Sequence, residues 1–223
     1  MKEELIFINN IDQLHEIYTF IFKKFFDKIF RGRYVMRIIT GVAKGKKLKN
    51  IKGMRVRPTL DRVKESLFNI LANKVPDSNF LDLFSGTGNI GLEALSRGAK
   101  YVVFVDNHRE SIGVIKENIK LTCLDHYNYE IIFDDANKAI ERLSLRNQKF
   151  NIIFMDPPYA RGFVLPVINT IYQKNILEED GIIVVEHNKE EELPDNIGDL
   201  VMFRKEKYGS VFLTFYKKGA DIL

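Results

Sequence analysis

The chain has 223 residues, of which 45% are hydrophobic and 29% charged, and this composition is typical of a soluble globular protein. One cysteine, Cys123, excludes an intrachain disulfide framework, and the four histidines lack metal-ligand spacing, so we expect no metal site. No apolar run is long enough for a membrane span, and the acidic Glu3 and Glu4 argue against a secretory signal. We therefore expect a cytoplasmic monomer that does not contact a membrane.

The net charge of +4 conceals an uneven distribution. Residues 31–64 hold twelve Lys or Arg and one acid, Asp61, which is a local charge of +11, whereas the rest of the chain sums to −7. Such a block attracts polyanions and releases their counterions on binding. We favour nucleic acid over a membrane surface, because the segment lacks an amphipathic stripe of Trp, Phe and Leu. The basic residues expected to contact substrate are Arg37, Lys44, Lys46, Lys47 and Arg57.

Residues 1–35 are predicted to be an extension separate from the rest of the chain. Apolar residues recur at helical spacing between Ile11 and Ile29, which indicates an amphipathic helix. A second interpretation is that the extension is not native, because Met36 would serve as a start and Arg31-Gly32-Arg33 can be encoded by a purine-rich ribosome-binding sequence. Both interpretations stay open.

Residues 36–75 are expected to form an RNA-binding region, made of a small basic β-hairpin and a helix. The segments 37–40 and 46–51 flank Gly41 and Gly45 and alternate as hairpin strands do. Thr59 then offers an N-cap for a helix from about Leu60 to Asn73.

Residues 76–223 alternate between apolar strands and helices, and we expect them to form the catalytic domain. Strands are predicted at Phe80–Phe84, Tyr101–Val105, Tyr129–Phe133, Asn151–Met155 and Ile182–Glu186. This alternation is typical of an α/β fold with a parallel sheet covered by helices on both faces. The runs Val201–Glu206 and Val211–Tyr216 flank a short turn and predict an antiparallel hairpin at the end of the chain.

A glycine-rich loop follows the first of these strands. Residues 86–91 spell G-x-G-x-x-G at a strand-to-helix turn, and Asp106 ends the next strand, where a carboxylate can hold ribose hydroxyls. The pattern suits NAD or S-adenosylmethionine. Asp82 favours the latter, because an acid is unfavourable beside a pyrophosphate and favourable beside a sulfonium with an amino group. The residues expected to bind cofactor are Asp82, Phe84, Gly86, Gly88, Asp106, Asp135 and Ala136, although turn capping explains one of Asp134 and Asp135 equally well.

A second motif, Asp156-Pro157-Pro158-Tyr159, follows the strand Asn151–Met155. A guanine or adenine amino nitrogen is a weak nucleophile, because its lone pair is delocalised into the ring. The Asp156 carboxylate and the Pro157 carbonyl are suited to accept its two hydrogens, and the prolines remove competing N–H donors. Tyr159 offers a ring on which an extruded base can stack. We predict Asp156, Pro157 and Tyr159 to be catalytic and Pro158 to contact substrate.

The two motifs together resemble class I S-adenosylmethionine-dependent methyltransferases that act on exocyclic or amide nitrogens. Further segments narrow the resemblance to the bacterial 16S rRNA (guanine(966)-N(2))-methyltransferase family, RsmD, over about residues 36–217. These segments are 36–41, 44–48, 57–59, 63–69 and 91–98. The resemblance implies a Rossmann-like sheet of seven strands with the last antiparallel, S-adenosylmethionine as cofactor, and methylation of guanine N2 in 16S rRNA, within a 30S particle.

Other functions stay open at this point. A DNA adenine-N6 methyltransferase shares the second motif, but 223 residues leave little room for a target-recognition domain. A glutamine-N5 methyltransferase typically has Asn where Asp156 stands and needs no basic block. An NAD-dependent oxidoreductase would explain the glycine loop and not residues 156–159. A non-enzymatic RNA-binding assembly factor would not need Asp156.

Overall fold

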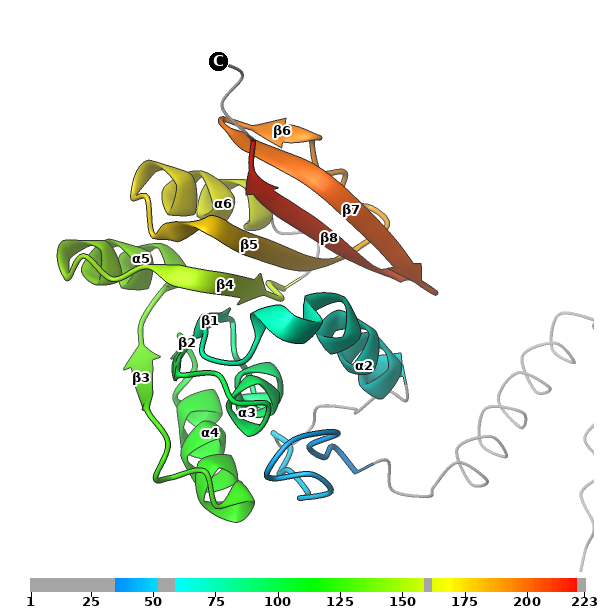
Figure 1. Cartoon of the computed structure of the whole chain (residues 1–223), viewed down its shortest axis with the longest axis vertical. Coiled ribbons are helices and arrows are strands. Elements are labelled where there is room, and N and C mark those ends of the chain that lie inside the picture. The colour runs from blue at the N-terminus through cyan, green and yellow to red at the C-terminus, as the bar shows by residue number, and fades with distance from the viewer. Residues whose placement is uncertain (1–34, 52–58, 159–161, 220–223) are drawn as a thin grey trace, which may run out of the picture. The chain divides into compact units, whose positions relative to one another are not determined.

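The computed structural model describes residues 35–51, 59–158 and 162–219, and its centre is a single mixed sheet (Figure 1). Five parallel strands come first in the chain: β1 (Asn79–Leu83), β2 (Tyr101–Asp106), β3 (Tyr129–Phe133), β4 (Phe150–Met155) and β5 (Leu177–Asn188). Three more follow: β6 (Asn196–Ile197), β7 (Leu200–Tyr208) and β8 (Val211–Lys218). Their order across the sheet is β3-β2-β1-β4-β5-β8-β7-β6.

The carboxyl-terminal strands make the sheet mixed. β8 pairs antiparallel with both β5 and β7, so the predicted hairpin and the antiparallel last strand are confirmed. The predicted number of strands, seven, is wrong for this chain, because the described residues form eight. The additional strand is β6, whose two residues are too few to produce a recognisable alternation of apolar and polar positions.

Helices cover both faces of the sheet, as the alternation predicts. One face packs against α2 (Thr59–Leu71), α3 (Asn89–Ser96) and α4 (Arg109–Thr122). The other packs against α5 (Ala136–Leu145) and α6 (Val164–Gln173). The helix predicted from about Leu60 to Asn73 is therefore observed as α2, followed by a short 3-10 turn, Ala72–Lys74.

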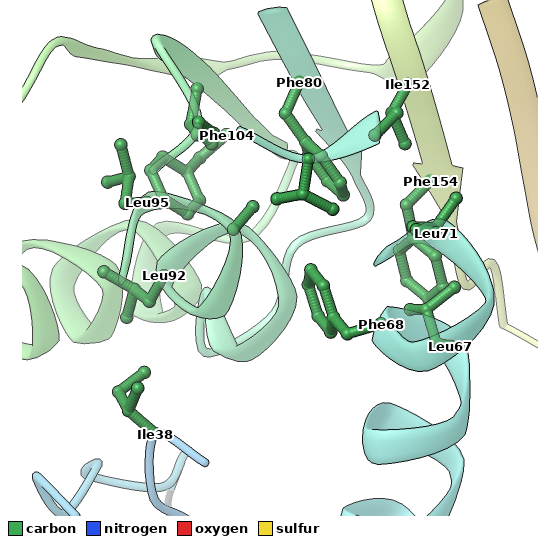
Figure 2. Packing of buried hydrophobic residues seen from close by; sticks show 14 of the residues in the cluster. Ile38, Leu67, Phe68, Leu71, Phe80, Leu92, Leu95, Phe104, Ile152 and Phe154 are labelled. Atoms are coloured by element: carbon green, nitrogen blue, oxygen red, sulfur yellow. The ribbon is translucent and has the colours of Figure 1, made fainter. Parts of the chain in front are cut away.

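Successive residues of the central strands enter opposite layers of the core, as the pleat requires. Phe80 and Phe104 belong to the layer under α2 and α3, where Figure 2 shows them beside Leu92, Leu95 and Phe68. Their neighbours in the same strands, such as Leu81 and Val103, belong to the layer under α5 and α6. Both faces of these strands are buried, which explains their continuous apolar sequence.

Residues 35–51 lie against α3 and α4 without forming strands. The predicted β-hairpin is reduced to one antiparallel bridge, Arg37 with Lys47, supported by the hydrogen bond from Ile38 N to Lys46 O at 2.9 Å. The two arms also share the hydrogen bonds from Gly45 N to Ile38 O and from Leu48 N to Met36 O, both at 2.8 Å, but other backbone groups of the segment bond to side chains of the helices. Glu93 of α3 accepts the backbone N–H groups of Ile39 and Thr40, at 2.7 and 2.9 Å.

Residues 1–34, which are the predicted extension apart from Val35, lie outside the described residues, and so do residues 52–58 within the basic block. Within the part of the chain that the structure describes, no helix is long and apolar enough to cross a membrane.

Candidate active site

The two sequence motifs meet at the carboxyl edge of the sheet. β1 and β4 are parallel neighbours with Leu83 opposite Met155, so the glycine loop after β1 and Asp156 after β4 leave the sheet side by side. In open α/β sheets ligands bind at this edge, where the strand order reverses between β1 and β4. The topology therefore assigns both motifs to one site.

The glycine loop has the backbone conformation that its sequence predicts. Gly86 and Gly88 have φ of +55° and +76°, in the left-handed region that favours glycine. Phe84 also lies there, with φ of +59°, which is a strained conformation for an aromatic residue and marks the loop as a functional candidate. A Cβ at Gly91 would lie 2.3 Å from the Phe104 ring, so α3 can approach β2 this closely only with glycine there.

Asp82 is buried in β1 and holds the start of α3. Its Oδ2 accepts the Gly91 N–H at 2.9 Å. Burial, with a smaller contribution from repulsion by Asp106 and Asp156, raises the pKa of Asp82 to about 8, although the Gly91 hydrogen bond acts in the opposite direction. Three carboxyl groups therefore act on one another at this edge.

Asp106, at the end of β2, binds the glycine loop directly. Its Oδ2 accepts the Gly86 N–H at 2.8 Å, and its Oδ1 accepts the His108 N–H at 2.8 Å. Oδ1 also lies 3.2 Å from His108 Nδ1, whereas Oδ2 keeps a further lone pair for a ligand hydroxyl. Ser85, which the glycine pattern does not single out, completes the connection, because its hydroxyl donates to Asp82 O and accepts from Val105 N, at 2.6 and 2.9 Å.

Asp156 is partly buried at the end of β4, and burial raises its pKa to about 7. Pro157 behind it is buried and Pro158 is exposed, while Tyr159 lies outside the described residues. Asp82, Asp106 and Asp156 therefore place three carboxyl groups at this edge of the sheet. This donor set suits a cationic ligand such as a sulfonium with an amino group, and it would repel a pyrophosphate.

The next strand contributes Asp135 and Ala136. Asp135 is the N-cap of α5, and its Oδ1 accepts the Asn137 N–H at 2.9 Å, which is the capping role that the sequence left open. Ala136 is buried at the first position of α5. Contact of either residue with a cofactor stays a prediction.

Phe163 is a further aromatic residue of this edge that sequence reasoning missed. It lies after the Asp156 motif, 39% exposed, and its ring centroid is 6.4 Å from that of Phe84. No spacing rule singles out Phe163, because the pair forms only when the loops after β1 and β4 are brought together.

The basic residues divide into exposed and buried ones. Arg37, Lys44, Lys46 and Lys47 are exposed, as a phosphate-binding role requires, whereas Arg57 lies outside the described residues. Lys64, counted in the basic block, is buried, and its Nζ lies 3.3 Å from Glu93 Oε2. It also donates to Arg37 O and to Asn89 Oδ1, at 2.6 and 2.8 Å. Its charge is thus neutralised inside the protein and does not add to the surface potential.

Asn118 of α4 joins the basic segment to the glycine loop. This buried amide accepts from Lys49 N at 2.7 Å and donates to Lys49 O and Thr87 O, at 3.0 and 2.9 Å. The spacing along the chain gives no sign of the connection. It makes the position of the basic segment dependent on the conformation of the loop.

Comparison with known proteins agrees with this geometry. The model of the family described as "Conserved hypothetical protein 95" matches residues 36–217 of the chain. The chain belongs to this family. The "Putative rRNA methyltransferase YlbH" of Bacillus subtilis (strain 168) is 43% identical over 183 residues, which are 82% of this chain and 99% of the relative. "Ribosomal RNA small subunit methyltransferase D" of Escherichia coli (strain K12) is 34% identical over 191 residues, 85% of this chain and 93% of the relative.

A solved structure, described as "Putative methyltransferase yhhF from Escherichia coli", has a TM-score of 0.72 and 33% sequence identity, and covers 84% of this chain and 99% of that chain. The family is the RsmD-type family of S-adenosylmethionine-dependent methyltransferases. The predicted family and cofactor are confirmed, and an NAD-dependent oxidoreductase is excluded. Within the described ranges, no group of three His, Cys, Asp or Glu residues is arranged to hold a metal ion.

Proposed function

We propose that this RsmD-type chain methylates the exocyclic N2 of a guanine in 16S rRNA, and that the target corresponds to guanine 966 in an assembling 30S particle. The observation that carries the proposal is the position of Asp156, a partly buried carboxyl group at the end of β4, beside the glycine loop of β1. The name of the E. coli relative, a ribosomal RNA small subunit methyltransferase, supports the substrate class.

The chain's own groups would activate the guanine amine by holding it. The Asp156 carboxylate and the Pro157 carbonyl accept the two amino hydrogens, which directs the nitrogen lone pair toward the bound sulfonium. The cofactor would supply the methyl group to the nitrogen, with S-adenosylhomocysteine as the leaving group. The Asp156 carboxylate would accept the proton that the amine loses. Orientation of two reactants in this way can supply roughly 7–11 kcal/mol of the barrier reduction.

Cofactor and base would be held by different parts of the edge. Asp82 and Asp106, with Gly86, Gly88 and Phe84, would hold the cofactor. Tyr159 would stack on the extruded base, and Pro158 would support it. Asp156 must be ionised to accept a hydrogen bond from the amine, and the positive charge of the bound cofactor would favour that state.

Residues 36–75 would bind the RNA and residues 76–223 would carry the chemistry. Arg37, Lys44, Lys46 and Lys47 are exposed cations of the described segment and would contact phosphates. Such contacts give affinity and orientation, while base identity is determined at the Asp156 site.

Methyl transfer from labelled S-adenosylmethionine tests the proposal. The substrates are small ribosomal subunits and 16S rRNA from cells that lack this gene, and the labelled RNA is digested to nucleosides. We expect label in N2-methylguanosine. Label in N6-methyladenosine would contradict the guanine assignment, and label in DNA alone would move the function to the DNA adenine-N6 class.

A further inference from the structure

The β7–β8 hairpin reaches the same edge of the sheet as Asp156. Met155 lies opposite Val185 of β5, and two residues further along β5, His187 lies opposite Phe212 of β8. Phe212 in turn lies opposite Lys207 of β7. The hairpin is therefore on the β5 side of Asp156, whereas the glycine loop is on the β1 side (Figure 1).

An aromatic ring with two ammonium groups stands at this end of the hairpin. The ammonium nitrogens of Lys205 and Lys207 are 5.2 and 5.8 Å from the centroid of the half-buried Phe212 ring. The His187 ring stacks on Phe212, with centroids 5.6 Å apart and an interplanar angle of 23°. We call His187, Lys205, Lys207 and Phe212 the hairpin patch.

The imidazole beneath Phe212 is held in place and uncharged. Its Nδ1 donates to Asn188 O at 2.9 Å, so Nε2 accepts from the Thr214 hydroxyl at 2.8 Å. Burial lowers the pKa of His187, and the charge of Lys205 lowers it further. Phe212 is thus supported by a rigid neutral ring on a regular strand, and rigid support reduces the entropy lost when a ligand stacks.

The two lysines are not explained by pairing within the chain. In the described parts of the protein no carboxylate forms an ion pair with either of them, and the intervening Glu206 pairs with Arg204 at 2.9 Å. One ammonium group is enough for a cation–π contact, and a second beside the same ring adds repulsion between like charges. Such an arrangement is unfavourable for the free protein and favourable for one that binds an anion.

We propose that the hairpin patch binds the single-stranded rRNA segment next to the target guanine, with a base stacked on Phe212 and the adjacent phosphates bound by Lys205 and Lys207. This inference rests on the proposed function and extends its substrate site to a region without predicted site residues. Alternation of a π-face with cations is the chemistry by which single-stranded nucleic acid is held. An RNA bound there and by the basic segment would pass over Asp156.

Tryptophan fluorescence tests the stacking directly, because the chain contains no tryptophan. Phe212→Trp places one fluorophore in the hairpin patch. Phe203→Trp is the matched control, since Phe203 has its own lysine, Lys217 at 5.6 Å, and packs on Phe215, which belongs to the buried core. We expect an unmodified 16S rRNA transcript to quench the first variant and leave the second unchanged. No quenching of Phe212→Trp, or equal quenching of both, would overturn the proposal.

Kinetics separate this proposal from the proposed function. We expect Lys205→Gln with Lys207→Gln to raise the KM for 16S rRNA about tenfold at moderate salt, while Lys100→Gln with Lys217→Gln, exposed lysines elsewhere, leave it unchanged. If wild-type protein methylates rRNA and both double variants have its KM, the patch is overturned and the function stands. If wild-type protein methylates no RNA, the function fails, and the quenching experiment still decides whether the patch binds RNA.

Discussion

The ammonium group of Lys64 lies 3.3 Å from the carboxylate of Glu93, and both side chains are buried. Glu93 also accepts the backbone N–H groups of Ile39 and Thr40, so this one carboxylate joins α2, α3 and the basic segment. The pair fixes the surface that is proposed to bind RNA onto the layer that holds the glycine loop.

Loss of this pair should destabilise the protein strongly. Glu93→Gln leaves the Lys64 charge buried without its counter-charge, and we expect the free energy of unfolding in urea to fall by about 3–5 kcal/mol. Glu117→Gln is the control, because its pair with Lys49 is exposed and should contribute less than about 1 kcal/mol. Similar losses in both variants would contradict a special role for the buried pair.

Asp156 should control the rate of methyl transfer. We expect Asp156→Ala to reduce kcat by roughly 10²–10⁴ with cofactor affinity retained, by analogy with the loss of a positioned proton acceptor. Because burial raises the pKa of Asp156 to about 7 in the free protein, and the ionised form accepts the amine hydrogens, the wild-type kcat/KM should rise with pH through that region. Asp156→Asn should remove this rise, and near-normal turnover in the alanine variant would refute the assignment.

Asp82 should make the free protein less stable as pH rises. Its pKa is about 8 in the folded protein, against an ordinary value of 3.8, so the folded state binds more protons between these two pH values. The Asp82 contribution to stability is therefore lost as pH rises from about 4 to 8. Asp82→Asn keeps an acceptor for the Gly91 N–H. Between pH 5 and pH 8 the free energy of unfolding should therefore fall less in this variant than in the wild type, while its cofactor affinity falls.

Charge reversal at Lys46 and Lys47 should weaken RNA binding in a salt-dependent way. Both side chains are exposed in the basic segment, and removing the charge that neutralises one phosphate should flatten the slope of log K against log salt by roughly 0.7–0.9. Lys100→Glu with Lys174→Glu makes the same change at the amino-terminal ends of β2 and β5. Equal decreases of affinity in the two double variants would show a general charge effect and no defined RNA-binding surface.

Sequence alone was sufficient where the signal is local. The strands, the glycine loop and the β7–β8 hairpin were predicted because alternation, glycine positions and buried apolar runs reflect neighbours within a few residues. The residues after β1 and β4 were predicted to serve one site, and the parallel pairing of these strands places them at the same edge of the sheet.

Tertiary structure decided what depends on partners distant in the chain. Lys64 belongs to a basic block by composition, but in the structure it is buried and forms an ion pair with Glu93 of another helix. The segment 37–51 alternates like a hairpin, yet helix side chains bind part of its backbone, and only one bridge forms between its arms. Phe163 and Phe212 become candidate site residues only through the rings and cations that the fold places beside them. Contacts between separate elements produce no periodic pattern in the sequence, so sequence reasoning missed both residues.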